Sequence, residues 1–319
     1  MKRRHFLKTT AAAATLLGYF PAGLSNMARE KNPGKLEKRT LGRTGEKLSF
    51  LGFGGLVVTD ASPSEATERV AEAIDHGINY FDVAPSYGDA EIKLGPALEP
   101  YRSKVFLACK TMERKKEGAL KELERSLTRM RTDRFDLYQL HAMTSREDVE
   151  TVFSPDGALN GFLQAKREGK IRFIGFSAHS VEAATALMER FDFDTILFPI
   201  NFATWHAGNF GPQVLAMAQE KGLGILALKA MARGPWPKVT KERTPKCWYR
   251  PLSDPEDALL GLRFTLSHAV TAAIPPGNEN LFRLALHLAD KFEPLSPDEV
   301  REMKEKGSAE QPLFRYPQN

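Results

Sequence analysis

Short apolar runs and amphipathic segments alternate along the chain from about residue 37 onwards. Runs rich in β-branched and aromatic residues predict eight strands, at 48–54, 79–83, 105–109, 135–140, 171–176, 195–200, 224–228 and 270–274. Between them, apolar residues at helical spacing predict helices at 64–76, 117–130, 181–190, 212–221, 254–267 and 280–291. This alternation is typical of a parallel sheet, and eight strands favour a closed barrel over an open doubly wound sheet.

Residues at the predicted helix ends agree with this assignment. Ser62 and Glu65 have the spacing of a capping box, and Pro63 between them suits the first position of a helix. Asp254 before Pro255 marks another helix start in the same way. The sequence therefore predicts an α/β fold, a single-domain (β/α)8 TIM barrel over residues 37–319.

The first 28 residues predict a targeting segment that precedes the barrel. Arg3 and Arg4 are followed by an uncharged run at 9–20, which is too short for a bilayer span of about 20 residues. Residues 2–8 resemble the twin-arginine (Tat) export signature of bacteria. We expect a signal peptide at 1–28, the Tat machinery as a partner, and a periplasmic or otherwise exported protein without a stable membrane anchor. A disordered basic tail is the alternative.

Charge and cysteine content exclude several classes of function. The formal charge of +5 comes largely from the leader, whose first 25 residues contain no Asp or Glu, so we expect no nucleic-acid partner. Cys109 and Cys247 are the two cysteines of the chain. They are too few for a disulfide scaffold and lack the C-x-x-C spacing of zinc or iron–sulfur sites, although one bridge between them stays open.

Polar side chains follow six of the predicted strands. In chain order they are Asp82 with Tyr87, Lys110, His141, Ser177 with His179, Asn201 and Lys229. Parallel strands of a barrel all end at its C-terminal mouth, so these side chains are expected to converge there, with the long loop 231–253 above them. An acid, a phenol, an ammonium and an imidazole in one place indicate proton transfer to a developing oxyanion.

Each of these residues has an expected partner in that chemistry and also an ordinary structural alternative. A nearby Lys110 ammonium favours the ionised form of Tyr87 and would lower its pKa from the ordinary value of about 10. Asp82 would pair with Lys110, and His141 would orient the reacting oxygen. Taken singly, Asp82 could cap a loop, Lys110 could be a solvated strand end and His141 a core histidine.

Several stretches of the chain resemble the aldo-keto reductase family, over about residues 37–290. The matching stretches are 39–45, 79–88, Lys110, 136–141 and 169–177, and the strongest is the Phe-Asp-x-Ala-x-Ser-Tyr-Gly pattern at 81–88. The resemblance implies a catalytic tetrad of Asp82, Tyr87, Lys110 and His141. It also implies that a reduced nicotinamide delivers hydride to an aldehyde or ketone while the tyrosine protonates the oxygen, with no metal and with a small carbonyl or alcohol compound as substrate.

The cofactor site departs further from the family pattern. The expected cofactor-binding residues are Ser177, Asn201, Lys229, Gly277 and Arg283, with NADP(H) as first choice and NAD(H) as the alternative. Of the Ser-Asn pair that the family usually carries after the fifth strand, this chain has only Ser177. After the seventh strand it lacks the family's usual Tyr-Ser-Pro-Leu stretch. Beyond the eighth strand, Arg283 is the nearest cation for a 2′-phosphate, and the helix start beside it offers backbone N–H groups.

Two other classes of function stay open. His141, His179 and Asp82 could bind a metal ion in a metal-dependent barrel hydrolase, although barrels of that kind usually carry His-x-His on the first strand and residues 48–54 contain none. A non-catalytic, exported barrel binding protein is the second alternative, since the nicotinamide site departs from the family.

Overall fold

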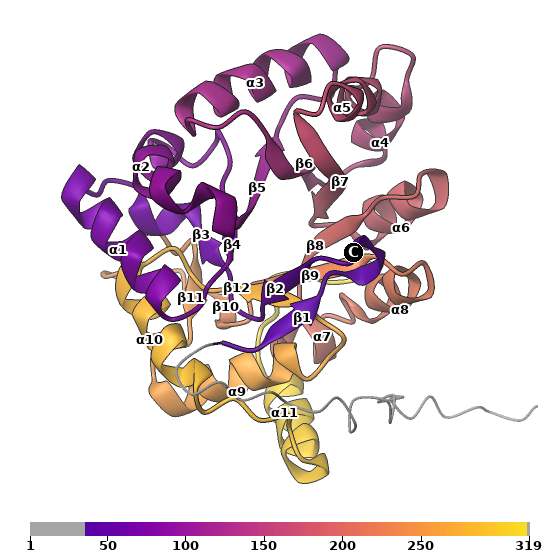
Figure 1. Ribbon diagram of the computed structural model, residues 1–319. Helices are drawn as coiled ribbons and strands as arrows, with labels where there is room; N and C mark the ends of the chain where they lie inside the picture. The colour runs from indigo at the N-terminus through magenta and orange to yellow at the C-terminus, as the bar shows by residue number, and fades with distance from the viewer. Residues whose placement is uncertain (1–35, 318–319) are drawn as a thin grey trace, which may run out of the picture. The chain divides into compact units, whose positions relative to one another are not determined.

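The computed structural model describes residues 36–317. Its centre is a parallel sheet whose strand order follows the chain (Figure 1). The strands are β3 (Phe53–Gly54), β4 (Tyr80–Asp82), β5 (Phe106–Thr111), β6 (Phe135–Met143), β7 (Ile171–Ala178), β8 (Thr195–Pro199), β9 (Gly224–Leu228) and β12 (Ala272–Ile274). A parallel bridge between Leu51 and Ala273 joins the two ends of the sheet, and the Gly52 N–H donates to the Ala273 carbonyl at 3.0 Å. The predicted (β/α)8 barrel is confirmed.

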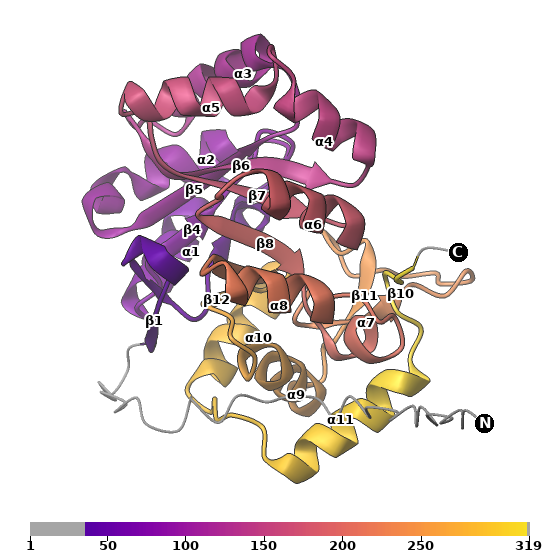
Figure 2. The ribbon, with the colours of Figure 1, turned by 90° about the vertical axis from the view of Figure 1, so that its right-hand side faces the viewer.

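Helices surround the barrel (Figures 1 and 2). They are α1 (Pro63–Asp75), α2 (Ala90–Leu98), α3 (Lys116–Arg129), α4 (Arg146–Phe153), α5 (Ala158–Arg167), α6 (Val181–Arg190), α7 (Phe202–His206), α8 (Pro212–Glu220), α9 (Pro255–Leu266), α10 (Glu279–Ala289) and α11 (Pro297–Ala309), with short 3-10 turns η2 (Gly42–Thr44), η3 (Gly55–Val58) and η4 (Glu99–Lys104). All six predicted helices are present with ends within two residues. The capping box of α1 is formed, since Ser62 accepts from the Glu65 N–H and the Glu65 carboxylate accepts from the Ser62 N–H.

The first predicted strand, 48–54, is divided in two. Its beginning is β2 (Lys47–Ser49), which pairs antiparallel with β1 (Lys38–Thr40), and only its end joins the barrel as β3. Leu41 and Leu48 of this hairpin are fully buried and pack with residues of the barrel interior. Apolar side chains therefore close the barrel at the end opposite its mouth.

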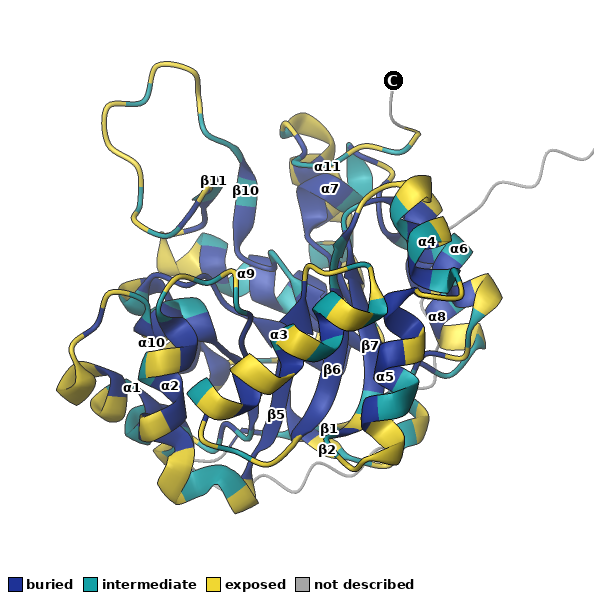
Figure 3. Ribbon diagram, turned by 90° about the horizontal axis from the view of Figure 1, so that it is seen from above, coloured by how far each residue is buried: buried dark blue, intermediate teal, exposed yellow. Residues whose placement is uncertain are grey.

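The loop after β9 contains a hairpin of its own. Strands β10 (Ala232–Pro235) and β11 (Tyr249–Pro251) pair antiparallel, and the residues between them project from the molecule (Figure 3). The Trp236 indole N–H donates to the Cys247 carbonyl at 2.9 Å and ties the two sides of this loop together. The hairpin begins four residues after β9 and therefore stands at the mouth of the barrel.

The C-terminal segment also returns to the mouth. After α11, the ring of Phe314 lies 5.4 Å from the ring of His179 and 6.1 Å from that of Trp248, measured between centroids. The Tyr316 N–H donates to the Gly208 carbonyl and fixes the segment there. Within residues 36–317, no helix combines the length and apolarity required to cross a membrane.

Candidate active site

Strand ends β4 and β5 bring Asp82 and Lys110 into a buried ion pair. The two side chains are only 2% and 1% exposed. The Lys110 ammonium donates to the Asp82 carboxylate, and also to the Val83 carbonyl at 3.3 Å. The predicted pairing of these two residues is confirmed.

Two further side chains hold the Asp82 carboxylate. The Tyr80 hydroxyl donates to it at 3.1 Å and the Gln139 amide donates at 3.2 Å. The sequence interpretation gave neither residue a role. Strand alternation offers a signal for Tyr80, because residues two apart on β4 face the same side. Gln139 stands opposite Lys110 in the register of β5 and β6, which the sequence alone does not give.

The phenol of Tyr87 lies above this pair. Tyr87 follows β4 in a tight turn, in which its N–H donates to the Ala84 carbonyl, and the turn continues through Gly88 at a φ of 58°. The Lys110 ammonium is 5.0 Å from the centre of the Tyr87 ring. The His141 ring meets the same ring edge-on, with centroids 5.7 Å apart and an interplanar angle of 84°. The four residues expected to form a tetrad therefore lie together at the mouth.

Burial and charge together set the protonation of the phenol and the ammonium. Burial raises the pKa of Tyr87 and the Lys110 ammonium opposes that rise without cancelling it, so the phenol is neutral at pH 7. The prediction that Lys110 lowers the pKa of Tyr87 below its ordinary value was wrong, because it did not include the burial of the phenol. Burial also disfavours the charged Lys110, but the charge of the Asp82 carboxylate outweighs it and holds the pKa of Lys110 above its usual value.

His141 is a neutral imidazole in this site. Burial, followed by the charge of Lys110, lowers the pKa of His141 to about 3. Its Nδ1 lies 3.3 Å from the hydroxyl oxygen of Ser86, on the loop that carries Tyr87. A neutral ring can donate a hydrogen bond through one nitrogen while the other accepts, which suits a group that positions a carbonyl oxygen.

The next three strand ends carry Ser177, Asn201 and Lys229. The Ser177 hydroxyl accepts from the Ala142 N–H at 2.8 Å. The side-chain oxygen of Asn201 caps α7 by accepting from the Thr204 N–H at 2.9 Å, whereas its Nδ2 is buried and has no hydrogen-bond partner within residues 36–317. A buried amide donor without an acceptor is costly, so this group fits a ligand carbonyl such as the carboxamide of a nicotinamide.

Gly277 and Arg283 lie at the other end of the expected cofactor site. A Cβ on Gly277 would stand 2.3 Å from Cβ of Leu56, so this close approach requires glycine. The Arg283 guanidinium is bound to both carboxylate oxygens of Glu72, at 3.0 and 3.2 Å. The helix start beside it is also engaged, because the Asn278 side chain accepts from the first free N–H groups of α10. A phosphate bound here would have to compete with these partners. At the opposite end of the expected cofactor site, by contrast, the Asn201 Nδ2 has no partner within residues 36–317.

The alternative of a metal-dependent hydrolase finds no ligand set in residues 36–317. No group of three or more His, Cys, Asp and Glu side chains there could hold a metal ion. Asp82, which that alternative requires, already accepts from an ammonium, a phenol and an amide.

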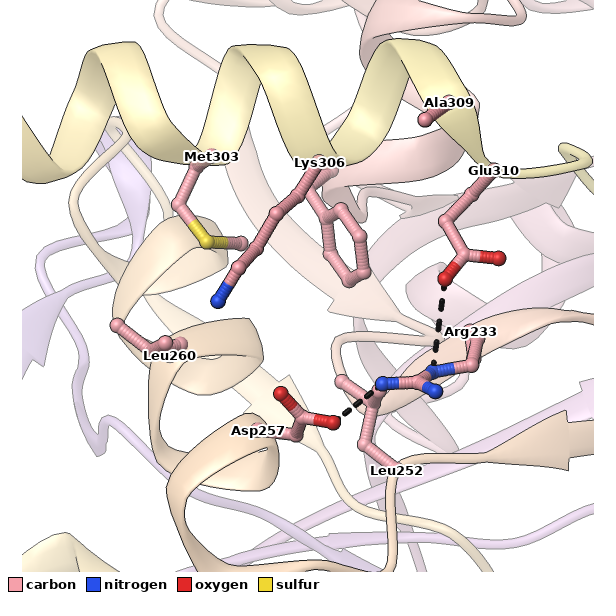
Figure 4. A pocket seen from close by; sticks show the side chains of 9 residues that line it. Arg233, Leu252, Asp257, Leu260, Met303, Lys306, Ala309 and Glu310 are labelled. Atoms are coloured by element: carbon pink, nitrogen blue, oxygen red, sulfur yellow. Dashed lines mark hydrogen bonds and ion pairs between the residues drawn. The ribbon is translucent and has the colours of Figure 1, made fainter.

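A separate pocket of about 270 Å³ lies between α7, α9, α11 and β10 (Figure 4). Arg233 crosses it and is paired with Asp257 and Glu310, while Met303 and Leu260 form an apolar wall. None of the tetrad residues lines this pocket. It is therefore distinct from the candidate active site at the mouth.

Comparisons with known proteins identify the family of this chain. The sequence profile of the aldo/keto reductase family matches residues 50–306, and the chain belongs to that family. It is 30% identical over 232 residues to the L-galactose dehydrogenase of Arabidopsis thaliana, an alignment that covers 67% of this chain and 70% of the relative.

Two solved structures share the fold. A holo-form aldo-keto reductase from Bacillus halodurans superposes with a TM-score of 0.70 at 23% identity, covering 89% of this chain and 99% of that one. An aldo/keto reductase from Klebsiella pneumoniae in complex with NADP and acetate gives a TM-score of 0.67 at 22% identity, with the same coverage of both chains.

Proposed function

We propose that the protein reduces an aldehyde or ketone to the alcohol with a reduced nicotinamide cofactor, and that Tyr87 is the proton donor. The observation that carries this proposal is the neutral phenol of Tyr87 placed beside the Lys110–Asp82 ion pair and the neutral imidazole of His141. This cluster combines a proton donor, a cation and an oxygen-positioning group.

Each residue has one task in this reaction. The Tyr87 hydroxyl gives its proton to the carbonyl oxygen as that oxygen gains charge. Lys110 stabilises the phenolate that remains, and Asp82, held by Tyr80 and Gln139, keeps the ammonium in place. The His141 imidazole positions the carbonyl oxygen next to the phenol.

The cofactor that fits best is NADP(H), with NAD(H) as the alternative. Bound at the mouth, its nicotinamide supplies the hydride that adds to the carbonyl carbon. The buried Nδ2 of Asn201 and the hydroxyl of Ser177 would hold the carboxamide, and Gly277 would allow the phosphates close to the backbone. NADP in the Klebsiella pneumoniae relative supports the choice of NADP(H). The pairing of Arg283 with Glu72 predicts a modest preference over NADH.

The direct experiment mixes the purified protein with NADPH or NADH and a panel of carbonyl compounds and follows the loss of reduced nicotinamide absorbance. The panel should contain aldose sugars and sugar lactones as well as aromatic aldehydes, because a relative is named for a sugar substrate. Cofactor oxidation that depends on both components supports the proposal. Cofactor binding without turnover of any compound would favour a binding protein instead.

We also propose that the protein is exported through the Tat pathway. The support is the arginine pair followed by a short uncharged run, which lies outside the described residues. Because the Tat pathway moves folded proteins, a cofactor acquired in the cytoplasm could travel inside the barrel.

A further inference from the structure

The side chain of Lys229, at the end of β9, lies between two aromatic rings. Its ammonium is 4.7 Å from the centre of the Tyr249 ring and 5.0 Å from that of Trp248. The backbone of Lys229 has a φ of 68°, a left-handed conformation that is uncommon for a residue with a side chain. Within residues 36–317 the ammonium makes no hydrogen bond and no ion pair, whereas Lys110 in the same mouth is paired with Asp82.

The groups that face Lys229 do not supply a counter-charge. They are the His179 imidazole, which follows β7 directly, the Cys247 thiol of the hairpin loop and the Tyr249 phenol of β11. Burial, followed by Lys229 itself, lowers the pKa of His179 to about 4 and keeps that ring neutral. Burial raises the pKa of the Cys247 thiol to about 11 and also raises the pKa of Tyr249, so both are neutral at pH 7.

An ammonium that is partly buried and has no anion beside it gains from a partner. Burial lowers the pKa of Lys229 to about 8, which is the expected response of a cation without an anion nearby. The two aromatic faces stabilise the charge only in part, because they carry no formal negative charge. The Tyr-Ser-Pro-Leu stretch that the resemblance leads us to expect after this strand is absent, and Lys229 lies in the stretch that replaces it.

We propose that Lys229 is an anion-binding residue of the mouth, whose ammonium pairs with an oxyanion of a bound molecule. Given the proposed function, on which this identification of the molecule rests, the oxyanion is either the diphosphate of the nicotinamide cofactor or a carboxylate of the carbonyl substrate. Both present the same chemistry to the ammonium, and they can be separated experimentally.

The test uses two variants and a control in the full chain. Lys229→Met keeps the length and the apolar contact with Trp248 but removes the charge, and Lys229→Arg retains a charge. Lys166→Met is the matched control, since it removes an ammonium that is paired with Asp194 on the outside of the barrel. Thermal unfolding of each variant checks that it is folded.

The first arm measures binding of NADPH and of inorganic diphosphate by quenching of tryptophan fluorescence. The second compares KM for 4-carboxybenzaldehyde and for 4-methylbenzaldehyde. If the partner is the diphosphate, Lys229→Met weakens binding in the first arm by about 10-fold or more. If it is a substrate carboxylate, the same variant raises KM about as much for the carboxylate compound alone. In either case the advantage of the wild type over Lys229→Met declines as the pH rises through about 8, because the Lys229 ammonium then loses its proton. Lys229→Arg keeps its charge over this range and does not show the decline.

Unchanged values in both arms for Lys229→Met would overturn the inference. The failure of the proposed function looks different, because the wild type would then bind no nicotinamide cofactor and reduce neither aldehyde. In that event titrations of inorganic diphosphate and of 4-carboxybenzaldehyde still decide about Lys229: binding of either that is lost in Lys229→Met supports an anion site, and equal behaviour of both proteins with both compounds contradicts it.

Discussion

At the scale of single residues, the Lys110 ammonium stabilises the negative charge of two groups, Asp82 and an ionised Tyr87. The ammonium neutralises Asp82 below and favours ionisation of Tyr87 above, while burial pushes the pKa of Tyr87 upward. The sequence predicted the partners of Lys110 correctly, because strand order alone places them together. It did not predict the net direction of the Tyr87 shift, since that depends on how much of the ring the surrounding loops cover.

Lys110→Met should move the pH dependence of the reaction upward. Reduction needs a neutral phenol, so its rate declines as the pH rises through the pKa of Tyr87. Without the ammonium, burial raises that pKa unopposed, and the decline shifts to higher pH. Oxidation of the alcohol needs the phenolate. At a given alkaline pH, Lys110→Met should therefore slow the oxidation more than the reduction, each compared with the wild type. Rates in both directions over a pH series measure this.

Stability provides the control for this variant. Removing Lys110 leaves Asp82 as a buried charge, which costs about 3–5 kcal/mol in comparable cases. The double variant Asp82→Asn with Lys110→Met removes both charges and should recover much of the stability without restoring the pH profile. A Lys110→Met profile that coincides with the wild type would argue against the assigned role.

At the scale of elements, Asp136 of β6 connects three neighbouring strands at the end of the barrel opposite the mouth. Its carboxylate accepts from the Leu107 N–H of β5 at 2.9 Å and pairs with Arg172 of β7 at 2.9 Å and with Arg102 at 3.1 Å. One buried carboxylate thus fixes the register of the strands that carry Lys110 and His141.

Asp136→Ala is expected to lower the free energy of unfolding by about 3–5 kcal/mol, because two guanidinium groups and a backbone N–H lose their acceptor. Asp133→Ala, an exposed position close by in the chain, should change it by less than about 0.5 kcal/mol. Chemical denaturation of both variants compares them. Equal stability of the two would show that Asp136 is not what holds these strands.

The same scale shows where hydrophobic patterns predict structure and where they do not. The eight barrel strands and six of the eleven helices within residues 36–317 were predicted, because each has a clear apolar pattern. Helices α2, α4, α5, α7 and α11 were not predicted. Helix α2 was missed since Gly95 and Pro96 interrupt it and most of its residues are buried, which hides the amphipathic pattern. The division of 48–54 depends on pairing with β1, and α7 has five residues, too few for a periodic signal.

At the scale of the whole molecule, the proposed export through the Tat pathway can be tested independently of the chemistry of the barrel. Replacing Arg3 and Arg4 together by Lys should retain the protein in the cytoplasm, because charge is preserved while recognition of the arginine pair is lost. Immunoblots of cytoplasmic and exported fractions measure this. Continued export of the double variant would mean that charge and apolarity alone direct the leader, and the reductase proposal would be unaffected.

The proposed reaction is the reduction of a carbonyl compound by a nicotinamide cofactor, with Tyr87 as the proton donor. The most direct measurement compares turnover and NADPH affinity of the wild type with those of Tyr87→Phe, using Tyr101→Phe on the turn η4 as the control. We predict that Tyr87→Phe lowers turnover by about 100-fold or more with cofactor affinity unchanged within a few-fold, and that Tyr101→Phe retains both. Unchanged turnover in Tyr87→Phe would show that Tyr87 is not the proton donor.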